Sequence, residues 1–516
     1  MLVESMVFTV MKSLVFLYSL ICVCYGREYT FPADFQFGTG TSAYQVEGAW
    51  NVGGKGESNW DRLTHTNPEA IADQSNGDIA CDTYSKTKQD VQLLKFLGVD
   101  FYRFSISWTR ILPNGKTDYI NPDGIRYYSD LIDELLANNI TPMVTMYHWD
   151  LPQTLEEEGG WTNLALVDYF TEYANILFER FGDRVKTWIT FNEASHICHF
   201  GYGGDLIAPM LKDKVAAYQC GKTVILAHAK VYHLYNERYR EVQKGRIGIS
   251  QHIIWFDPME KYYKDVNAAQ SALEYTFGWL VHPIFTKKGG YPPTMIASVE
   301  AASKKDNLPS SRLVDLTTEE IELIKGTADF LGVNHYTTAS CSHIGDEEIH
   351  PGLFYYADAD ASCVSDFTEE GAASFWLKVI PSGFRKALNW IKDQYNNPEV
   401  IITENGFSNF GHLINDCRRI YYYNAYLEEL LKAVHEDGCK VTGFTAWSFM
   451  DNFEWRSGYF ERFGLFAVDF EKPDRPRTAK MSAHIYKHIL RERKIDWKYT
   501  PEGFPECEWL RVKDEL

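Results

Sequence analysis

Short apolar runs rich in β-branched and aromatic residues recur along the chain and alternate with longer stretches of helical periodicity. The runs predict strands at residues 35–40, 99–106, 143–147, 187–191, 247–254, 330–334, 400–403 and 441–446. Stretches with apolar residues three or four positions apart predict helices at residues 88–97, 124–136, 166–181, 222–239, 383–395 and 420–435. This alternation favours the α/β class and a single (β/α)8 TIM barrel.

A doubly wound open sheet is the alternative fold, because it shows the same alternation of strands and helices. Such sheets usually carry a GxGxxG turn after the first strand. The glycines that follow the first predicted strand lack this spacing; they are Gly48, Gly53, Gly54 and Gly56. Long connections predict loops that build a pocket over the C-terminal face of the barrel, at residues 43–82, 255–291 and 337–381.

Both ends of the chain carry targeting patterns. A short apolar run that ends in Cys24-Tyr25-Gly26 is typical of a cleavable secretory signal, so we assign residues 1–26 to a signal peptide whose initiating methionine stays open. The run is too short for a membrane span. Residues 495–516 are interpreted as an irregular extension that ends in the endoplasmic reticulum (ER) retrieval signal Lys513-Asp514-Glu515-Leu516. We therefore expect one domain over residues 27–494, retained in the ER lumen by a KDEL-type receptor.

Composition narrows the classes of partner. A formal net charge of −19 without a basic stripe argues against nucleic acid, because phosphate binding needs clustered Lys and Arg. The ten cysteines fit an oxidising compartment, and spacings such as that of Cys198 and Cys220 permit disulfides but leave the pairing open. The aromatic content fits either core packing or a sugar-binding cleft. An N-glycosylation sequon starts at Asn139.

Polar side chains gather at the C-terminal sides of the predicted strands. They are Arg103, His148, Asn192, Glu193, Asn334, Tyr336, Glu404 and Trp447. This is the face on which a TIM barrel places its chemistry. Glu193 and Glu404, from the fourth and seventh predicted strands, are therefore expected to meet across the mouth of the barrel.

Two glutamates in one pocket suit general acid/base catalysis. In a retaining glycosidase they stand roughly 5 to 5.5 Å apart, one attacking the anomeric carbon while the other protonates the leaving oxygen. A divalent metal site is one alternative, but the sequence lacks the HExxH spacing. Two separately salt-bridged structural glutamates are another alternative. We favour acid/base catalysis without a metal or cofactor.

A series of longer motifs adds to this interpretation. They are Phe37-Gly38-Thr39, Ser42-Ala43-Tyr44-Gln45-Val46-Glu47-Gly48, Tyr102-Arg103-Phe104-Ser105-Ile106-Ser107-Trp108, His148-Trp149-Asp150-Leu151-Pro152, Thr190-Phe191-Asn192-Glu193, Asn334-His335-Tyr336, Ile402-Thr403-Glu404-Asn405-Gly406, Asp451-Asn452-Phe453-Glu454-Trp455 and Arg462-Phe463-Gly464. In this order they resemble glycoside hydrolase family 1, the β-glucosidase family. The resemblance runs from about residue 29 to residue 489, and Met146-Tyr147-His148-Trp149 resembles insect members in particular.

The resemblance implies a retaining β-glycosidase that hydrolyses terminal β-D-glucosides. It assigns Glu404 as the nucleophile, Glu193 as the acid/base, and Arg103 as a partner of the nucleophile. It also implies a substrate-binding set made of Gln45, His148, Asn192, Asn334, Tyr336, Trp376, Trp447, Glu454 and Trp455. In this set Tyr336 contacts the nucleophile, Trp376 flanks the aglycone and Trp447 lies beneath the sugar. A carboxylate such as Glu454 that contacts adjacent hydroxyls favours one sugar epimer.

One position departs from the family pattern, because Ala194 stands where proline usually follows the acid/base. Proline would stiffen the strand exit, so we expect a less fixed loop. The residues beyond it, Ser195, His196, Cys198 and His199, are expected on the aglycone side, where a protonated histidine could bind the sulfate of a thioglucoside. An insect-type thioglucosidase (myrosinase) or a transglycosylase on the same carboxylates is therefore an alternative. A non-catalytic sugar-binding ER protein is an alternative of another class, and the aglycone and oligomeric state stay open.

Overall fold

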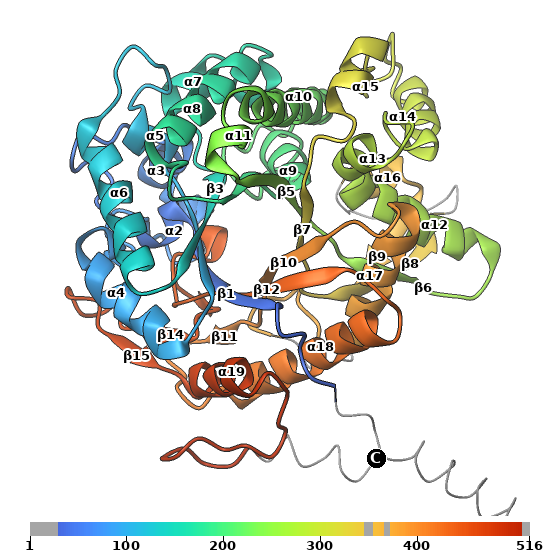
Figure 1. Ribbon diagram of the computed structural model, residues 1–516. Coiled ribbons are helices and arrows are strands. Elements are labelled where there is room, and N and C mark those ends of the chain that lie inside the picture. Colours follow the sequence, from blue (N-terminus) through green and yellow to red (C-terminus); the bar gives the residue numbers. More distant parts are fainter. Residues whose placement is uncertain (1–28, 345–353, 366–371, 508–516) are drawn as a thin grey trace, which may run out of the picture.

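A parallel barrel forms the centre of the computed structural model, which describes residues 29–344, 354–365 and 372–507. Within this described part, eight strands close into the barrel, and their order in space follows their order in the sequence (Figure 1). They are β1 (Gln36–Gly40), β2 (Phe101–Ser105), β3 (Thr141–Tyr147), β4 (Thr187–Asn192), β5 (Arg246–His252), β7 (Phe330–Asn334), β10 (Val400–Asn405) and β12 (Val441–Trp447). The predicted TIM barrel is confirmed, and each of these strands overlaps a predicted one.

The barrel interior is apolar at one end and polar at the other. All neighbouring strands run parallel; Thr39 of β1, for example, lies beside Ala446 of β12 and Tyr102 of β2. An apolar cluster fills the end where the strands begin, from Phe101, Met143, Ile189, Phe330 and Ile401. Packed side chains close this end of the barrel. Polar groups collect at the other end, where the strands finish, as in other TIM barrels.

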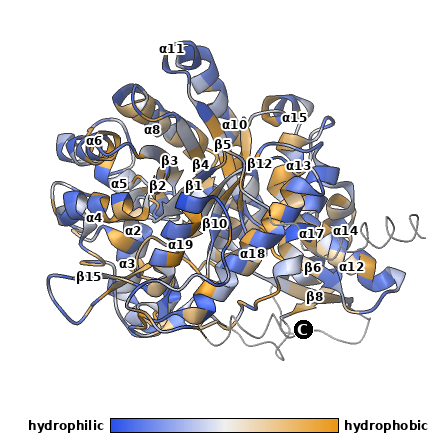
Figure 2. Cartoon of the chain, turned by 60° about the horizontal axis from the view of Figure 1, so that its bottom comes forward, coloured by the Kyte–Doolittle hydropathy of each residue, from blue (hydrophilic) through white to orange (hydrophobic). Residues whose placement is uncertain are grey.

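Amphipathic helices surround the barrel, and Figure 2 shows hydrophobic and hydrophilic stretches alternating along them. The six predicted helices are all present, as α4 (Thr83–Leu97), α6 (Pro122–Ala137), α8 (Leu166–Phe181), α10 (Lys214–Arg238), α17 (Pro381–Gln394) and α18 (Cys417–His435). Their ends follow local chemistry. The Asn121 side chain caps α6 by accepting from the amide of Asp123, and Gly98 ends α4 in a left-handed conformation.

The three long connections that the sequence predicts contain short regular elements as well as loops. The segment 43–82 holds α2 (Ala43–Val46), α3 (Asn59–Thr66) and η1 (Pro68–Ala70). The other two hold β6 (Trp255–Pro258), α12 (Tyr263–Leu273), η4 (Glu274–Gly278), α13 (Trp279–Phe285), β8 (Thr338–His343), α16 (Phe354–Asp358) and β9 (Ala361–Val364). Strands β6, β8 and β9 form a separate small sheet. Most of these elements are too short for periodicity to detect.

Further short elements complete the described fold. The helices are α5 (Trp108–Ile111), α7 (Gln153–Glu157), α9 (Ala194–His196), α11 (Arg240–Gln243), α14 (Pro293–Lys305), α15 (Thr318–Ile324) and α19 (Met481–Glu492). Helical turns are η2 (Gly160–Thr162), η3 (Ile197–Tyr202) and η5 (Trp455–Ser457). Two small antiparallel pairs are β11 (Asn409–Phe410) with β13 (Glu461–Arg462), and β14 (Phe466–Val468) with β15 (Arg477–Ala479).

Disulfides fix three places in the described part of the chain. Cys198 pairs with Cys220, Cys341 with Cys363, and Cys417 with Cys507. The last of these fastens the C-terminal extension to the start of α18. Cys81 and Cys439 are buried free thiols. The pairing that the sequence left open is thus settled for these residues.

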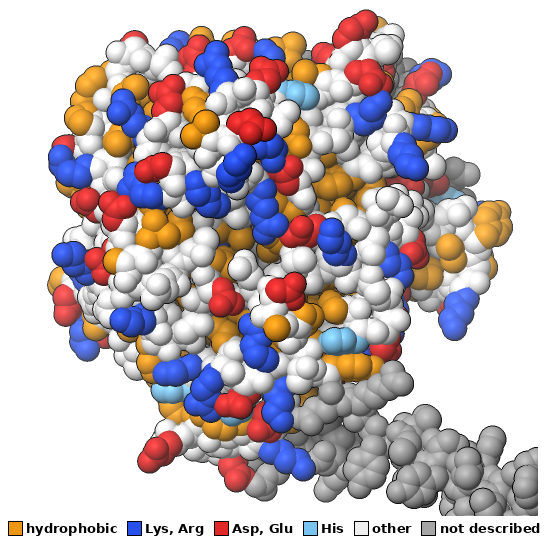
Figure 3. Space-filling model, viewed as in Figure 1, with side chains coloured by type: hydrophobic (Ala, Val, Ile, Leu, Met, Phe, Trp, Pro, Cys, Tyr) orange, Lys and Arg blue, Asp and Glu red, His pale blue; other side chains and the backbone are white. Residues whose placement is uncertain are grey.

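The described residues do not include the two predicted targeting segments. The predicted signal peptide, residues 1–26, and the Lys513-Asp514-Glu515-Leu516 signal lie outside the described residues. Among the residues that are described, no helix has the length and apolar character needed to cross a membrane. Asn139 of the predicted sequon is exposed, between α6 and β3. On the face shown in Figure 3, basic and acidic side chains are interspersed.

Candidate active site

The C-terminal ends of the barrel strands bring the predicted site residues together. Glu404 lies near the end of β10, Asn334 ends β7, Trp447 ends β12 and Glu193 directly follows β4. Arg103 is the exception, because it lies in the middle of β2 and not at its end. Its long side chain extends toward the C-terminal end of the barrel, so the guanidinium still reaches Glu404.

Glu404 is buried and held by two donors. Arg103 Nη1 donates to Glu404 Oε1 over 2.6 Å, and the Tyr336 hydroxyl donates to Oε2 over 2.7 Å. Arg103 Nη1 also bonds the backbone oxygen of Thr403, which fixes the guanidinium against the same strand. Both carboxyl oxygens therefore have a defined position, and the carboxylate faces a fixed cation.

Glu193 occupies a sharp corner between β4 and α9. Its φ of 49° lies in the left-handed region, where a residue other than glycine is uncommon. The corner is held by a hydrogen bond from its backbone N–H to the oxygen of Ser250, over 2.9 Å. Asn334 Nδ2 donates to Oε1 of the carboxyl over 2.7 Å. Ala194, at the position where the family usually has proline, is fully buried in the first turn of α9.

A shared polar network links the two glutamates. Asn192 accepts from Arg103 over 2.6 Å and from Asn334 over 3.1 Å through its Oδ1 atom. Asn334 Oδ1 in turn accepts from Thr403 and from Ser250. Arg103 thus contacts Glu404, Asn334 contacts Glu193, and both donate to Asn192. Several hydrogen bonds therefore fix the position of each carboxyl relative to the other.

The network contains three residues that sequence reasoning did not select. Thr145, Ser250 and Thr403 are buried, and Thr145 accepts from Arg103 Nε over 3.1 Å. They sit inside apolar strand runs, where a threonine or serine is as compatible with strand propensity as with a polar role. Thr403 could have been found from its position directly before Glu404; nothing local distinguishes the other two.

The two carboxyls differ in their protonation. Burial raises the pKa of Glu193 to about 8, and the negative charge of Glu404 adds to the rise. Burial also raises the pKa of Glu404, but the Arg103 cation and the Tyr336 hydroxyl oppose that rise. Glu404 therefore ionises before Glu193, and the pair at neutral pH consists of one carboxylate and one carboxylic acid.

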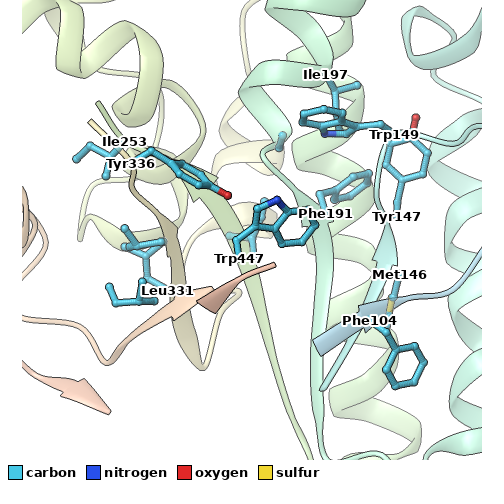
Figure 4. Packing of buried hydrophobic residues seen from close by; sticks show 14 of the residues in the cluster. Phe104, Met146, Tyr147, Trp149, Phe191, Ile197, Ile253, Leu331, Tyr336 and Trp447 are labelled. Carbon is cyan, nitrogen blue, oxygen red and sulfur yellow. The ribbon is translucent and has the colours of Figure 1, made fainter. Parts of the chain in front are cut away.

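An aromatic wall lies beside the two glutamates. The His148 ring stacks 5.8 Å from Trp447 and 5.9 Å from Trp455. Burial, with the charge of Arg103 second, holds the pKa of His148 well below its ordinary value, so the ring is neutral. Its Nε2 is 3.0 Å from Asn192 Nδ2, and its Nδ1 has no partner among the described residues. Figure 4 shows Trp447 between Tyr336 and Phe191.

Polar groups meet this wall at its edge. Gln45 Nε2 donates to the backbone oxygen of Phe453 over 2.9 Å and lies 3.4 Å from Glu454 Oε2. Burial raises the pKa of Glu454 well above its ordinary value, and the charges of Glu461, Glu404 and Glu193 add to it. A flat apolar ring bordered by amide and carboxyl groups suits a pyranose, which has apolar faces and a polar rim.

The opposite side of the site is formed by Trp376 and the segment after Glu193. Trp376 is half-buried, with its ring edge-on to Tyr336 at 5.7 Å. The His199 ring lies tilted against Tyr355 at 4.3 Å and against Trp279 at 4.7 Å, so it faces packed rings. Burial lowers the pKa of His199 to about 3. Cys198 of η3 is bonded to Cys220 of α10, which anchors this segment to the helix layer.

The barrel with its paired glutamates and sugar-sized aromatic wall defines a glycoside hydrolase. The sequence profile of Glycosyl hydrolase family 1 matches residues 27–495, and the chain belongs to this family. It is 46% identical to myrosinase 1 of Brevicoryne brassicae over 473 residues, which cover 90% of this chain and 99% of that protein. It is 43% identical to a cytosolic β-glucosidase of Cavia porcellus over 469 residues, covering 90% and 99% of the two chains.

A solved relative adds a structural comparison. A rice β-glucosidase mutant in a covalent complex with glucose superimposes with a TM-score of 0.83 at 40% identity, covering 89% of this chain and 99% of that chain. The family resemblance seen in the sequence is confirmed, and the chain is a β-glycosidase.

Proposed function

We propose that the protein is a retaining β-glucosidase in which Glu404 is the nucleophile and Glu193 the acid/base. The observation that carries this proposal is the different surroundings of the two carboxyls. Glu404 contacts Arg103 and Tyr336, whereas Glu193 is buried against the charge of Glu404. A retaining glycosidase needs this combination of one carboxylate and one carboxylic acid.

In the first step Glu404 attacks the anomeric carbon of the bound sugar. The bond between that carbon and the glycosidic oxygen breaks, and the proton of Glu193 passes to the departing oxygen. Arg103 keeps the nucleophile ionised, and Asn334 keeps the acid in place through its bond to Oε1. The rice relative captured in a covalent complex with glucose supports a glycosyl-enzyme of this kind.

In the second step the same acid becomes a base. Once Glu404 is esterified it carries no negative charge, so the Coulombic contribution that raised the pKa of Glu193 is lost. Glu193, left as a carboxylate when it gave up its proton, therefore stays ionised until it takes a proton from water as the water oxygen replaces Glu404 at the anomeric carbon. The configuration of the sugar is retained because it is inverted twice.

The sugar pocket supports glucose as the glycone. The residues that we assign to it are Gln45, His148, Asn192, Trp447, Glu454 and Trp455, with Asn334 and Tyr336 against the two glutamates and Trp376 toward the aglycone. His148 Nδ1 and the half-buried Glu454 offer polar atoms to the sugar hydroxyls. A site of this kind rejects an epimer whose hydroxyl leaves buried groups unpaired.

The test is hydrolysis of an aryl β-glucoside by Glu404→Gln. We expect loss of hydrolysis and loss of covalent labelling by a fluoroglucoside inactivator. Glu156→Gln is the matched control, since Glu156 is a half-buried carboxyl whose pKa is also raised, to about 7, but it contacts Tyr202 and Asn59. Activity near that of the unchanged enzyme in Glu404→Gln would refute the proposal. Absence of labelling in the unchanged enzyme would favour the non-catalytic sugar-binding alternative.

The similarity to an aphid myrosinase keeps thioglucosides as the second candidate substrate. The histidines after Glu193 argue for O-glucosides, because burial and neighbouring histidines hold the pKa of His196 well below its ordinary value and His199 is also neutral. Neither ring supplies the cation that a sulfate would need. A panel with an aryl glucoside, a glucosinolate and an alcohol acceptor separates glucosidase, thioglucosidase and transglycosylase.

We further propose that the protein works in the ER lumen, delivered by residues 1–26 and retrieved through Lys513-Asp514-Glu515-Leu516 by a KDEL-type receptor. The three disulfides of the described part support an oxidising compartment. Expression with and without the last four residues tests this: deletion should move the enzyme from the cells into the medium. Equal secretion of both forms would contradict retrieval.

A further inference from the structure

The proposed acid/base has one bonded carboxyl oxygen and one open one. Asn334 Nδ2 donates to Oε1 of Glu193, whereas no donor from the described residues bonds Oε2. An oxygen that accepts an N–H bond is the poorer site for the acid proton, so the proton belongs on Oε2. The nitrogen that faces this oxygen is Nε2 of His196, 4.0 Å away.

His196 is placed beside Glu193 by the tight turn that both residues share. Its backbone N–H donates to the oxygen of Glu193 over 2.8 Å. Its ring is held edge-on by Phe200 at 4.5 Å and by His252 at 4.6 Å. The ring atom Nδ1 is buried and has no hydrogen-bond partner among the described residues. Only ring contacts therefore hold the imidazole, and a small rotation can close the gap to Oε2.

The charged and titratable groups around His196 favour a neutral imidazole. It faces Glu193 from its own turn, His252 from the end of β5 and His199 from η3. Burial lowers the pKa of His196 most, and the two other histidines lower it further. A cation here would lower the pKa of Glu193 and favour loss of its proton before the leaving group needs it, whereas a neutral ring leaves Glu193 protonated.

We propose that His196 is a positioning residue that donates its Nε2–H to Oε2 of Glu193 once the leaving group has taken the acid proton. This bond gives the newly formed buried carboxylate a second donor and holds it for the attack of water. His196 gains and loses no proton in either step, because the proton moves between Glu193, the glycosidic oxygen and water. The inference rests on the proposed roles of Glu193 and Glu404.

Two variants test the proposal. His196→Phe keeps a ring between Phe200 and His252 but has no donor, and His196→Gln keeps a side-chain N–H near the position of Nε2. The substrate is dinitrophenyl β-glucoside, whose leaving group departs without a proton. Its kcat/KM therefore reports the first step without the acid, and its kcat reports the second step, in which Glu193 acts as a base.

We expect His196→Phe to lower kcat about tenfold, the value of a hydrogen bond to a charged group, with kcat/KM unchanged. The acid limb of kcat should move to higher pH, because loss of a donor to the carboxylate raises the pKa of Glu193. His196→Gln should restore most of both. Equal loss of kcat and kcat/KM, no change in either, or no recovery in His196→Gln would overturn the inference. An unchanged enzyme that released no dinitrophenol would instead overturn the proposed function, and this inference with it.

Discussion

Replacement of Tyr336 by phenylalanine isolates one contact of the proposed nucleophile. The change removes the hydroxyl that donates to Glu404 Oε2 over 2.7 Å. It keeps the ring, which packs against Trp376 at 5.7 Å and Phe463 at 6.0 Å. The other donor to Glu404, Arg103, is untouched. The variant should therefore fold normally and differ chiefly in the ionisation of Glu404.

The size of the effect follows from the chemistry of that bond. A hydrogen bond to a charged group is worth about 1.5 to 3 kcal/mol, and one pKa unit corresponds to about 1.4 kcal/mol. The bond favours the ionised carboxylate, so its removal raises the pKa of Glu404 by roughly one to two units. Because the nucleophile must be ionised, activity on the acid side of the optimum should fall, and the acid limb should move to higher pH by that amount.

The assay is the pH dependence of kcat/KM for an aryl β-glucoside, which reports ionisation in the free enzyme. Tyr426→Phe is the matched control, because its hydroxyl is also buried and donates to the backbone oxygen of Tyr336 over 3.1 Å without contacting Glu404. The control should leave the acid limb in place. An unmoved limb in Tyr336→Phe, or equal movement in both variants, would refute the assignment of Tyr336 as a donor that tunes the nucleophile.

Three further predictions concern the acid and the stability of the fold. Hydrolysis of aryl glucosides with poor leaving groups should decline above about pH 8, as Glu193 loses its proton, and dinitrophenyl glucoside should not show this decline in kcat/KM; a shared alkaline limb would contradict it. Cys507→Ser removes the disulfide that closes a loop of 90 residues from Cys417, so urea unfolding should show a loss of up to about 4 kcal/mol in stability. Under reducing conditions the variant and the unchanged protein should be equally stable. Lys480→Met leaves buried Asp451 without the cation 2.7 Å away and should cost about 3 to 5 kcal/mol, part of which Asp451→Asn should recover.

The barrel could be predicted from the sequence because its strands are buried on both faces and therefore appear as continuous apolar runs. The surrounding helices have one apolar stripe and were equally visible. The small sheet of β6, β8 and β9 was not, since its strands are only partly buried and therefore lack a continuous apolar run. The partner of β6 lies far along the chain, so no local pattern contains it.

The site was predictable to the extent that its residues end strands. Glu193, Glu404 and Asn334 are visible this way, whereas the role of Arg103 depends on the reach of a side chain from the middle of β2. The protonation of the pair could not be derived from sequence, because burial and the distance to a neighbouring charge decide it. Ser250 could not be selected either, because it reaches Asn334 only through the pairing of β5 with β7 in the folded barrel.

The bond between Cys198 and Cys220 links the setting of the proposed acid/base to the oxidation state of two cysteines. It fastens the segment that follows Glu193 to α10, whereas Glu404, Arg103 and the aromatic wall are supported by the barrel itself. Reduction of this bond would remove the covalent anchor of the turn that presents the proposed proton donor, while the contacts of Glu404 with Arg103 and Tyr336 do not depend on it. Oxidation of this pair thus contributes to catalysis as well as to stability, and an enzyme reduced at this bond should lose hydrolysis before it loses glucoside binding.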